Sequence, residues 1–167
     1  MRIWREKFKI FGCHAMEIDR KNYRILEELQ RDGRLSNKEL AQRVCLSESA
    51  TLRRVKLLED SGVIEGYFAR INPALVGKTG IVFAEISLVS QKQEQLDIFE
   101  KAVKEVPAVI ECYLLAGEFD YLLSLVVRDS VDYEHIHHDQ LTKLPGVARV
   151  KSNFALRKVV KKSTLPL

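Results

Sequence analysis

The chain has 167 residues, of which 46% are hydrophobic and 30% are charged, and its formal net charge is +4. This composition predicts a soluble protein with one sizeable core or two small domains. The longest apolar runs have strand length, far below the roughly 20 residues that a membrane helix needs, and the first residues lack the apolar stretch of a secretory signal. We therefore expect a cytoplasmic protein with no membrane partner.

Positive charge is concentrated in the first part of the chain. Residues 1–72 carry 15 Lys and Arg against 11 Asp and Glu, whereas residues 73–148 carry 6 basic against 12 acidic side chains. Neutralisation of phosphates supplies most of the sequence-independent affinity for DNA. A basic module beside an acidic one therefore indicates that the first part binds DNA and the second part has another role. A solvated basic face is the competing explanation.

Helical periodicity begins after Met16, and residues 1–15 stay unassigned as an N-terminal extension. Asp19 is the expected N-cap of a first helix that ends near Gly33. The three cysteines Cys13, Cys45 and Cys112 lie far apart and form no CxxC pair. This spacing argues against a disulfide framework and against a zinc site, so we expect neither a metal nor a cofactor.

Two short helices separated by a tight turn are predicted within Ser36–Glu59. Ser36 followed by Glu39 is a capping box that fixes the start of one helix, and Ser47 offers the N-cap of the next. Apolar positions recur at steps of three and four along one face of the second helix. They are Thr51, Leu52, Val55 and Leu58. This pair of helices is typical of a helix-turn-helix.

The opposite face of the second helix suits the major groove of DNA, where arginine reads guanine and lysine or hydroxyl groups bind phosphates. The candidate DNA-binding residues are Ser47, Ser49, Arg53, Arg54 and Lys56. The alternative is a merely solvated helix face. The extended segment Val63–Phe68 then predicts the hairpin of a winged helix-turn-helix, so we assign residues 16–72 to a DNA-binding domain.

Asn72-Pro73 and two nearby glycines break the pattern, and residues 73–80 are expected to be a linker. Residues 81–167 are predicted to form a second domain with the order βαββαβ. Strands are expected at 81–88, 109–116, 121–128 and 147–160, and helices at 95–106 and 130–143. This α+β order predicts the ferredoxin-like arrangement, an antiparallel sheet with two helices on one face.

The other face of the sheet should be apolar and should therefore meet a partner subunit. We expect its residues to come from the set Ile81, Phe83, Val109, Tyr113, Leu115, Leu123 and Leu125.

Five motifs follow one another along the chain: Ile18-Asp19, SNxELA, RVxxLExxGVI, GxFDYLL and LPGV. With this ordered set the chain resembles the Lrp/AsnC family of feast/famine regulators over about Ile18–Val160. The resemblance implies a transcription regulator that binds pseudo-palindromic DNA sites as a homodimer or as a larger assembly such as an octamer. It also implies that an amino acid or a related metabolite modulates DNA binding.

The resemblance places the effector at the connection between the second and third strands. The effector-binding residues that it implies are Leu114, Gly117, Phe119, Asp120 and Tyr121. Gly117 would let backbone amides approach a carboxylate, and Asp120 would pair with an ammonium group. The alternative is that Gly117 and Asp120 only form the turn of a hairpin.

A cluster of polar residues on the later helix raises one other function. Glu134, His135, His137, His138 and Asp139 lie close in sequence but match no recognised metal-binding pattern. They are the only support for an enzyme on the same architecture, similar to sirohaem decarboxylases. A DNA-independent amino-acid sensor is the third class, but it should lack the first domain. We therefore expect a regulator and not an enzyme.

Overall fold

The computed structural model describes residues 18–162 and 164–167 of the chain. Contacts divide the chain into two compact units, of which the second is Arg70–Val159. The C-terminal residues from Val160 belong with the first unit, and the backbone amide of Leu165 donates to Gln30 Oε1 at 2.5 Å. Among the described helices none is long and apolar enough to cross a membrane.

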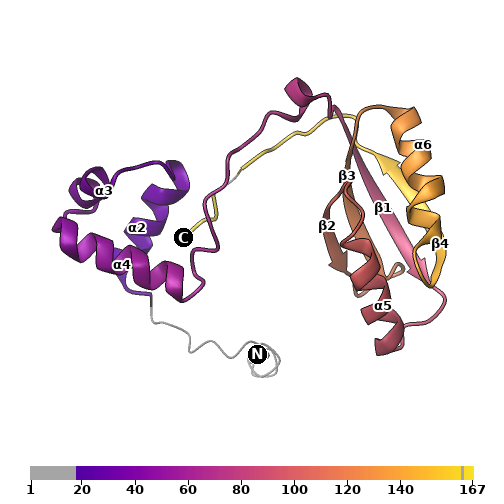
Figure 1. Ribbon diagram of the computed structural model, residues 1–167, viewed down its shortest axis with the longest axis horizontal. Coiled ribbons are helices and arrows are strands. Elements are labelled where there is room, and N and C mark those ends of the chain that lie inside the picture. The colour runs from indigo at the N-terminus through magenta and orange to yellow at the C-terminus, as the bar shows by residue number, and fades with distance from the viewer. Residues whose placement is uncertain (1–17, 163) are drawn as a thin grey trace. The chain divides into compact units, whose positions relative to one another are not determined.

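The first unit consists of α2 (Arg20–Arg31), α3 (Asn37–Val44) and α4 (Glu48–Asp60), which Figure 1 shows as three short helices. The predicted caps are confirmed, because Asp19, Ser36 and Ser47 each accept a hydrogen bond from a backbone amide in the first turn that follows. Each cap satisfies an amide that would otherwise lack a partner, which fixes where the helix begins. The buried residues between the helices are Ile25, Leu26, Leu40, Val44 and Leu58.

The predicted apolar face of α4 is correct except at Leu52. Thr51 and Leu58 are fully buried and Val55 packs against the core, but Leu52 is 59% exposed. The core face of α4 is centred on Thr51, whose hydroxyl donates to the Ser47 carbonyl at 3.0 Å. A residue one step further along the helix is turned by about 100° and so leaves that face.

The segment after α4 is extended, but the hairpin expected at Val63–Phe68 is absent, since residues 63–72 contain no paired strands. The segment is held to α4 instead. The Ile64 amide donates to the Leu58 carbonyl at 3.0 Å, and the Tyr67 hydroxyl donates to Glu59 Oε1 at 2.9 Å. The segment therefore packs on α4 as a single extended stretch, and no second strand pairs with it.

The second unit has the predicted βαββαβ order, preceded by a short 3-10 turn, η1 (Pro73–Val76). Its elements are β1 (Gly80–Leu88), α5 (Gln93–Val103), β2 (Val109–Leu114), β3 (Tyr121–Val127), α6 (Ser130–Asp139), η2 (Leu141–Lys143) and β4 (Val147–Phe154). The strands pair antiparallel in the order β2-β3-β1-β4. Asp129, and not Ser130, is the N-cap of α6, because its side chain accepts from the Asp132 amide.

Helices α5 and α6 cover one face of this sheet (Figure 1), and side chains from the sheet and from both helices form the core between them. Alternate residues of β1 and β3 point into it, as the period of two in each strand predicts. The buried strand residues are Val82, Ala84, Ile86, Leu88, Tyr121, Leu123, Leu125 and Val127. Phe99 and Val103 come from α5, and Tyr133 and Ile136 come from α6.

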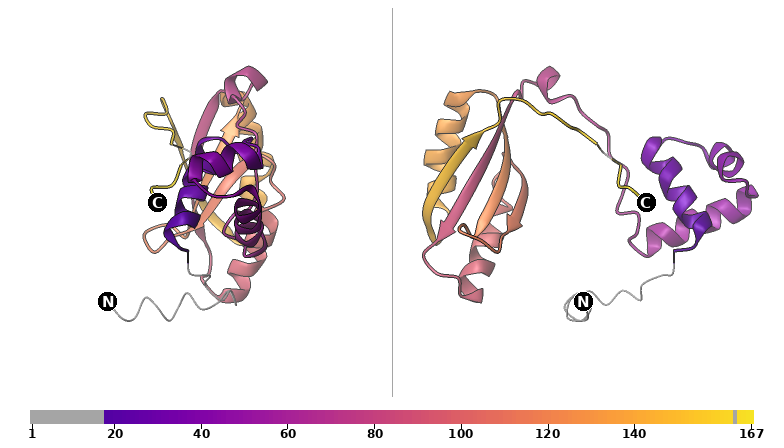
Figure 2. Two further views of the ribbon diagram at one scale, coloured as in Figure 1. Left: turned by 90° about the vertical axis from the view of Figure 1, so that its left-hand side faces the viewer. Right: turned by 180° about the vertical axis from the view of Figure 1, so that it is seen from behind.

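The other face of the sheet carries no helix of the described chain (Figure 2). Its composition differs from the expectation, because Leu123 and Leu125 are buried on the helix side and Val109 packs there too. Strand register decides this: Phe83 pairs with Ser124 and Tyr113 pairs with Leu122, so these residues share the open face. We call this the open face, formed by Ile81, Phe83, Glu85, Ser87, Glu111, Tyr113, Leu122, Ser124, Val126, Arg149, Lys151 and Asn153.

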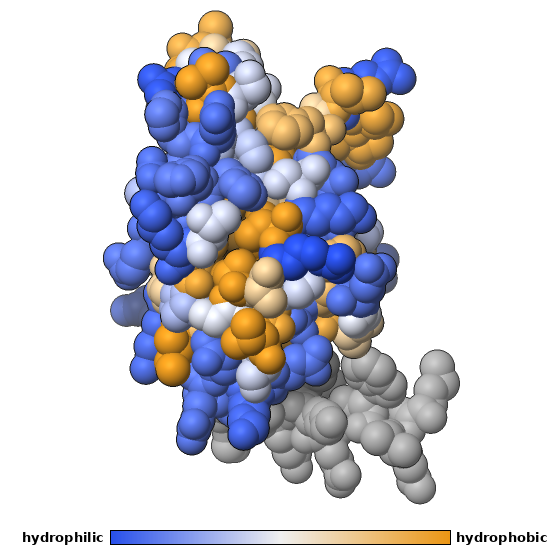
Figure 3. Space-filling view, turned by 90° about the vertical axis from the view of Figure 1, so that its right-hand side faces the viewer, coloured by the Kyte–Doolittle hydropathy of each residue, from blue (hydrophilic) through white to orange (hydrophobic). Residues whose placement is uncertain are grey.

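Polar groups on the open face lie beside the apolar ones. Glu85 Oε2 is buried and lies 3.2 Å from Lys151 Nζ, although no aligned hydrogen bond reaches it. The Asn153 amide donates to the other oxygen of Glu85 at 3.3 Å. Figure 3 shows, on one side of the molecule, apolar side chains exposed among hydrophilic ones.

The turn between α3 and α4 contains the only non-glycine residue with a positive φ among the described residues. Cys45 has φ 55° and ψ 52°, a left-handed conformation that costs a residue with a Cβ about 1–2 kcal/mol. Its side chain is exposed, and the residue closes α3 by donating its amide to the carbonyls of Ala41 and Gln42.

We predict that Cys45→Gly raises the free energy of unfolding of the first unit by about 0.5–1 kcal/mol, since glycine adopts this conformation without strain but loses more entropy on folding. Cys45→Val is the matched control and should lower the free energy of unfolding, because a β-branched side chain fits the left-handed region poorly. Chemical denaturation of the full chain measures both. A glycine variant less stable than the parent would contradict the assignment.

Candidate DNA-binding and effector sites

The outer surface of α4 brings together four of the five predicted DNA-binding residues. Ser47, Ser49, Arg53 and Lys56 are all exposed. Ser47 and Ser49 lie at the start of the helix, with their hydroxyl oxygens 3.3 Å apart. Neither Arg53 nor Lys56 has an ion pair or side-chain hydrogen bond to any residue that the structure describes. Their donors are therefore available to a phosphate or a base.

Arg54 is placed differently from the other four. Its Nη1 donates to Asp19 Oδ2 at 2.7 Å and to Asn22 Oδ1 at 2.9 Å, and its side chain is only 26% exposed. Hydrogen bonds from the Asn22 amide and from Arg54 hold the pKa of the Asp19 carboxyl below its usual value. Arg54 thus joins α4 to the N-terminus of α2. Periodicity along α4 gave no signal for this contact, because the partners lie far away in sequence.

The turn that precedes α4 is also held from α3. The side-chain amide of Asn37 donates to the Glu48 carbonyl at 2.9 Å. On the far side of α3, Arg43 donates to Glu28 Oε2 at 3.1 Å and so connects α3 to α2. With Arg54, these contacts fix α4 against both other helices, so its outer surface is presented in one orientation.

The predicted effector residues fall into a buried pair and an exposed group. Asp120 is buried, and each carboxylate oxygen already accepts a hydrogen bond. The donors are the Leu88 amide at 2.6 Å and Gln91 Nε2 at 2.7 Å. Its own amide donates to the Ile86 carbonyl at 2.9 Å. Asp120 therefore anchors the β2–β3 connection to the end of β1, a role that needs Gln91, which sequence patterns did not single out.

Tyr121 is a core residue with 1% of its surface exposed. Its ring centroid lies 4.5 Å from that of Phe99, and its hydroxyl donates to Glu100 Oε1 at 2.9 Å. Burial and the hydrogen bond to Glu100 raise the pKa of Tyr121 above its usual value. Both contacts hold the start of β3 against α5.

Leu114 and Gly117 are exposed, and Phe119 is partly exposed. A Cβ added at Gly117 would meet no atom within 4 Å. The Phe119 ring lies against the cations of β4, with its centroid 5.1 Å from Arg149 Cζ and 5.2 Å from Lys151 Nζ. Leu114 pairs with the buried Tyr121 and so lies on the helix side of the sheet, whereas Phe119 lies against residues of the open face. We refer to these three accessible residues together as the loop surface.

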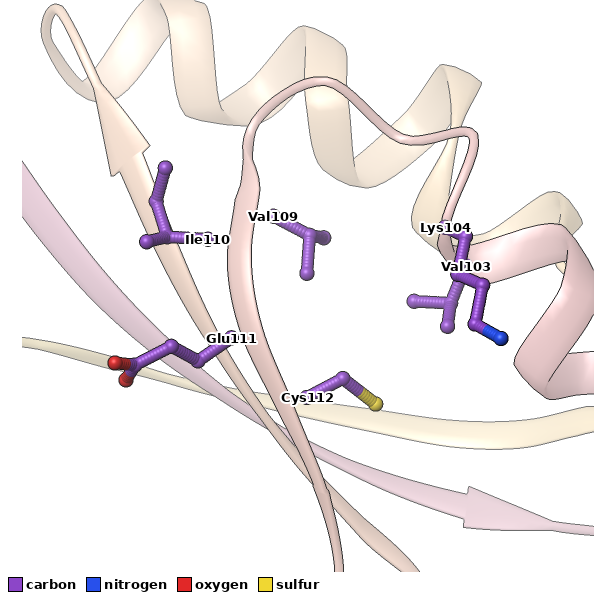
Figure 4. Close-up of a pocket in the computed structure, with 6 residues that line it drawn as sticks. All are labelled: Val103, Lys104, Val109, Ile110, Glu111 and Cys112. Carbon is purple, nitrogen blue, oxygen red and sulfur yellow. The ribbon is translucent and has the colours of Figure 1, made fainter. Parts of the chain in front are cut away.

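A cavity of about 260 Å³ lies beside β2 (Figure 4). Val109 and Cys112 point from β2 toward the end of α5, where Val103 and Lys104 close the other side. Cys112 as a whole is exposed, but partial desolvation of its thiol, together with the nearby Glu100 carboxylate, raises the pKa of the thiol to about 11. No predicted effector residue lines this cavity.

The histidines of α6 do not converge on one point. The His137 ring centroid lies 5.9 Å from that of Tyr133, while His138 Nδ1 lies 3.1 Å from Asp139 Oδ1. Within the described part of the chain, no group of three or more His, Cys, Asp or Glu side chains could hold a metal ion. The cluster therefore lacks the geometry of a metal centre there.

Comparison with known families gives a match in each unit. The family described as the Lrp/AsnC ligand binding domain matches residues 81–165, and the family described as winged helix-turn-helix DNA-binding matches residues 18–65. The Bkd operon transcriptional regulator of Pseudomonas aeruginosa is 42% identical over 151 residues, which cover 90% of this chain and 99% of that relative. The leucine-responsive regulatory protein of Escherichia coli is 38% identical over 89% of this chain and 91% of its own length.

Solved structures agree with these relatives. A transcriptional regulator of Neisseria meningitidis in complex with L-methionine has a TM-score of 0.83 and 36% identity, covering 89% of this chain and 96% of that one. The feast or famine regulatory protein of Mycobacterium tuberculosis complexed with L-methionine has a TM-score of 0.81 and 32% identity, covering 89% and 98%. The helix-turn-helix followed by a small antiparallel sheet with helices is thus confirmed.

The two neighbouring arginines of α4 should respond differently to substitution. We predict that Arg53→Ala weakens binding to a specific duplex by about 1–3 kcal/mol, the value expected for an arginine whose donors contact a base. It should change the free energy of unfolding by less than about 0.5 kcal/mol. Arg54→Ala should lower that free energy by about 1–2 kcal/mol, since the buried Asn22 oxygen loses its donor.

Fluorescence anisotropy with labelled DNA and chemical denaturation separate the two effects, and Arg24→Ala on α2 serves as a matched loss of one exposed arginine. Unchanged DNA affinity in the Arg53 variant would contradict the assignment of α4 as the reading helix.

Proposed function

This chain belongs to the Lrp/AsnC family of DNA-binding transcription regulators, and from that premise we propose how its residues read DNA and respond to an effector. The proposed DNA contacts are Arg53, Ser47, Ser49 and Lys56. Arg53 is directed at a base, and the hydroxyls and Lys56 bind phosphates. The observation that carries this proposal is that Arg53 and Lys56 project from α4 without a partner among the described residues.

We assign Arg54 a supporting role in this site. Its contacts with Asp19 and Asn22 engage Nη1 and direct the guanidinium toward α2. The second arginine of the pair keeps α4 in place while the first one reads a base.

The proposed effector is an amino acid that binds at the loop surface of Leu114, Gly117 and Phe119. The L-methionine in the two similar structures supports an amino acid as the class of ligand. Gly117 carries no side chain and lies open, so backbone amides near it can approach a carboxylate. Asp120 and Tyr121 hold the connection in place beneath this surface, because their polar groups already have partners inside the chain.

The chain is proposed to act as a homodimer that assembles further, octamers included. The open face exposes the aromatic side chains of Phe83 and Tyr113 to 39% and 51%, and exposed aromatic surface is unfavourable in water. A second copy that covers this face would remove that surface from solvent. It would also bring two α4 helices to one pseudo-palindromic site, since two-fold symmetry in the protein is matched by two half-sites.

An enzyme on this architecture and a DNA-independent sensor are the other classes. The histidines of α6 give the enzyme little support, because they do not converge, and the exposed basic surface of α4 is not needed by a sensor. We propose that the protein works without catalysis and in the cytoplasm. A gel shift on the DNA upstream of its own gene, with an absorbance spectrum of the purified protein, separates the classes: a shift without tetrapyrrole absorbance supports the regulator.

Gly117→Val should abolish the response to the effector without unfolding the domain, because a side chain there meets nothing within 4 Å in the protein but occupies the approach to the backbone. Calorimetry with each of the twenty amino acids measures binding, and thermal denaturation measures stability. Asp120→Asn is the contrast, and it should lower stability by weakening the bonds from Leu88 and Gln91. If the Gly117 variant binds an amino acid with the same heat and affinity as the parent protein, the loop surface is not the effector site.

Phe83→Asp should convert the dimer into a monomer at micromolar concentration, because it places a charge in the centre of the proposed interface. Ile98→Asp is the matched control, since Ile98 is 50% exposed on α5, away from the open face. Sedimentation velocity reports both. A parent protein that sediments as a monomer at this concentration would overturn the proposed assembly.

A further inference from the structure

Leu52 is a large apolar side chain on the polar surface of α4. It is 59% exposed, so the core does not need it. Thr51 and Leu58, which are fully buried, and Val55 fill the contact between α4 and the other helices. An isolated exposed leucine is ordinary on a protein surface. Its position among the proposed DNA contacts sets this one apart.

Helix geometry places Leu52 beside those contacts. Residues three or four apart lie next to each other on a helix surface, so Leu52 neighbours Ser49 on one side and Lys56 on the other. Side chains also lean toward the N-terminus of their helix, which brings Leu52 closer to the first turn of α4. The first turns of a recognition helix are the part that meets base edges. Leu52 therefore belongs to the surface that enters the groove.

The major groove offers an isobutyl group one apolar partner. Phosphates and the hydrogen-bonding edges of bases give no favourable contact to an apolar side chain, whereas the C5-methyl group of thymine does. We propose that Leu52 is a specificity-determining residue that recognises a thymine methyl group within each half-site. This inference rests on the proposed function of α4 as the reading helix, and it adds a base that Arg53 does not choose.

Leu57 provides a matched control on the same helix. It is also a leucine and is 50% exposed. Five residues separate it from Leu52, which turns it by about 140° around the helix axis. It lies further from the N-terminus of α4, beside Arg53 and away from Ser49 and Lys56. Loss of Leu57 should therefore leave the difference between thymine and deoxyuridine unchanged, even where it alters the overall affinity through Arg53.

The test uses the full-length protein and a duplex that it selects from a pool of random sequences. Each thymine of that duplex is replaced in turn by deoxyuridine, which lacks only the methyl group. With the parent protein, one substitution in each half-site should weaken binding about fourfold, the value of one buried methyl group. Leu52→Ala should bind the thymine and deoxyuridine duplexes equally. Leu52→Met, which keeps an apolar side chain, and Leu57→Ala should retain the difference.

The outcomes distinguish this inference from the function on which it rests. If the pool yields no enriched duplex, the proposed DNA-binding function fails and the role of Leu52 fails with it. If a duplex is enriched but every deoxyuridine substitution is neutral, DNA binding stands and the role of Leu52 is overturned. A fourfold difference that persists in Leu52→Ala, or a selected site without thymine, overturns it equally. Circular dichroism of Leu52→Ala confirms that α4 is intact.

Discussion

The contact of Arg54 with Asp19 and Asn22 sets the rotation of α4 about its own axis, and the proposed DNA-reading surface depends on that rotation. Asp19 is itself the N-cap of α2, so one guanidinium connects the start of one helix to the middle of another. A turn of α4 by one residue would bury Leu52 and expose Thr51, which is fully buried and bonded to Ser47. The apolar core and the polar contact therefore select the same orientation, in which Arg53 and Lys56 face outward.

The effector-binding unit uses a buried carboxylate in a similar way. Asp120 accepts hydrogen bonds from the Leu88 amide and from Gln91, and these bonds join the β2–β3 connection to the end of β1. An exposed loop would otherwise lose this position easily, because short connections have few buried contacts. In both units, then, a charged side chain near the functional surface stabilises the backbone, and its neighbours in sequence remain free to meet a ligand.

Local patterns were sufficient to predict most of the fold. The caps Asp19, Ser36 and Ser47 act within one helical turn, and the alternation in β1 acts within one strand, so both can be read from adjacent residues. Strand register could not be read in this way. Leu123 and Leu125 look equally suitable for either face of the sheet until the pairing of β3 with β1 places them in the core. The hairpin after α4 was wrongly predicted for the same reason, because a strand forms only with a pairing partner and the local sequence does not specify one.

The candidate sites show the same limit, because contacts between residues far apart in sequence decide the role of each residue. The sequence predicted sites on the surface of α4 and at the β2–β3 connection, but it did not show which of the predicted residues have their polar groups bound within the chain. Arg53 and Arg54 are chemically identical neighbours, and only the positions of Asp19 and Asn22 distinguish their roles. Similarly, Gln91 and Glu100 decide the roles of Asp120 and Tyr121.

The central claim is that the outer surface of α4 lies in the groove of DNA, and photo-cross-linking tests it directly. A photoreactive amino acid at position 49 of α4, and separately at position 98 of α5, would be irradiated in the presence of a duplex selected by the parent protein. The account predicts a covalent protein–DNA adduct from position 49 and none from position 98. Binding of the duplex without an adduct from position 49 would contradict it.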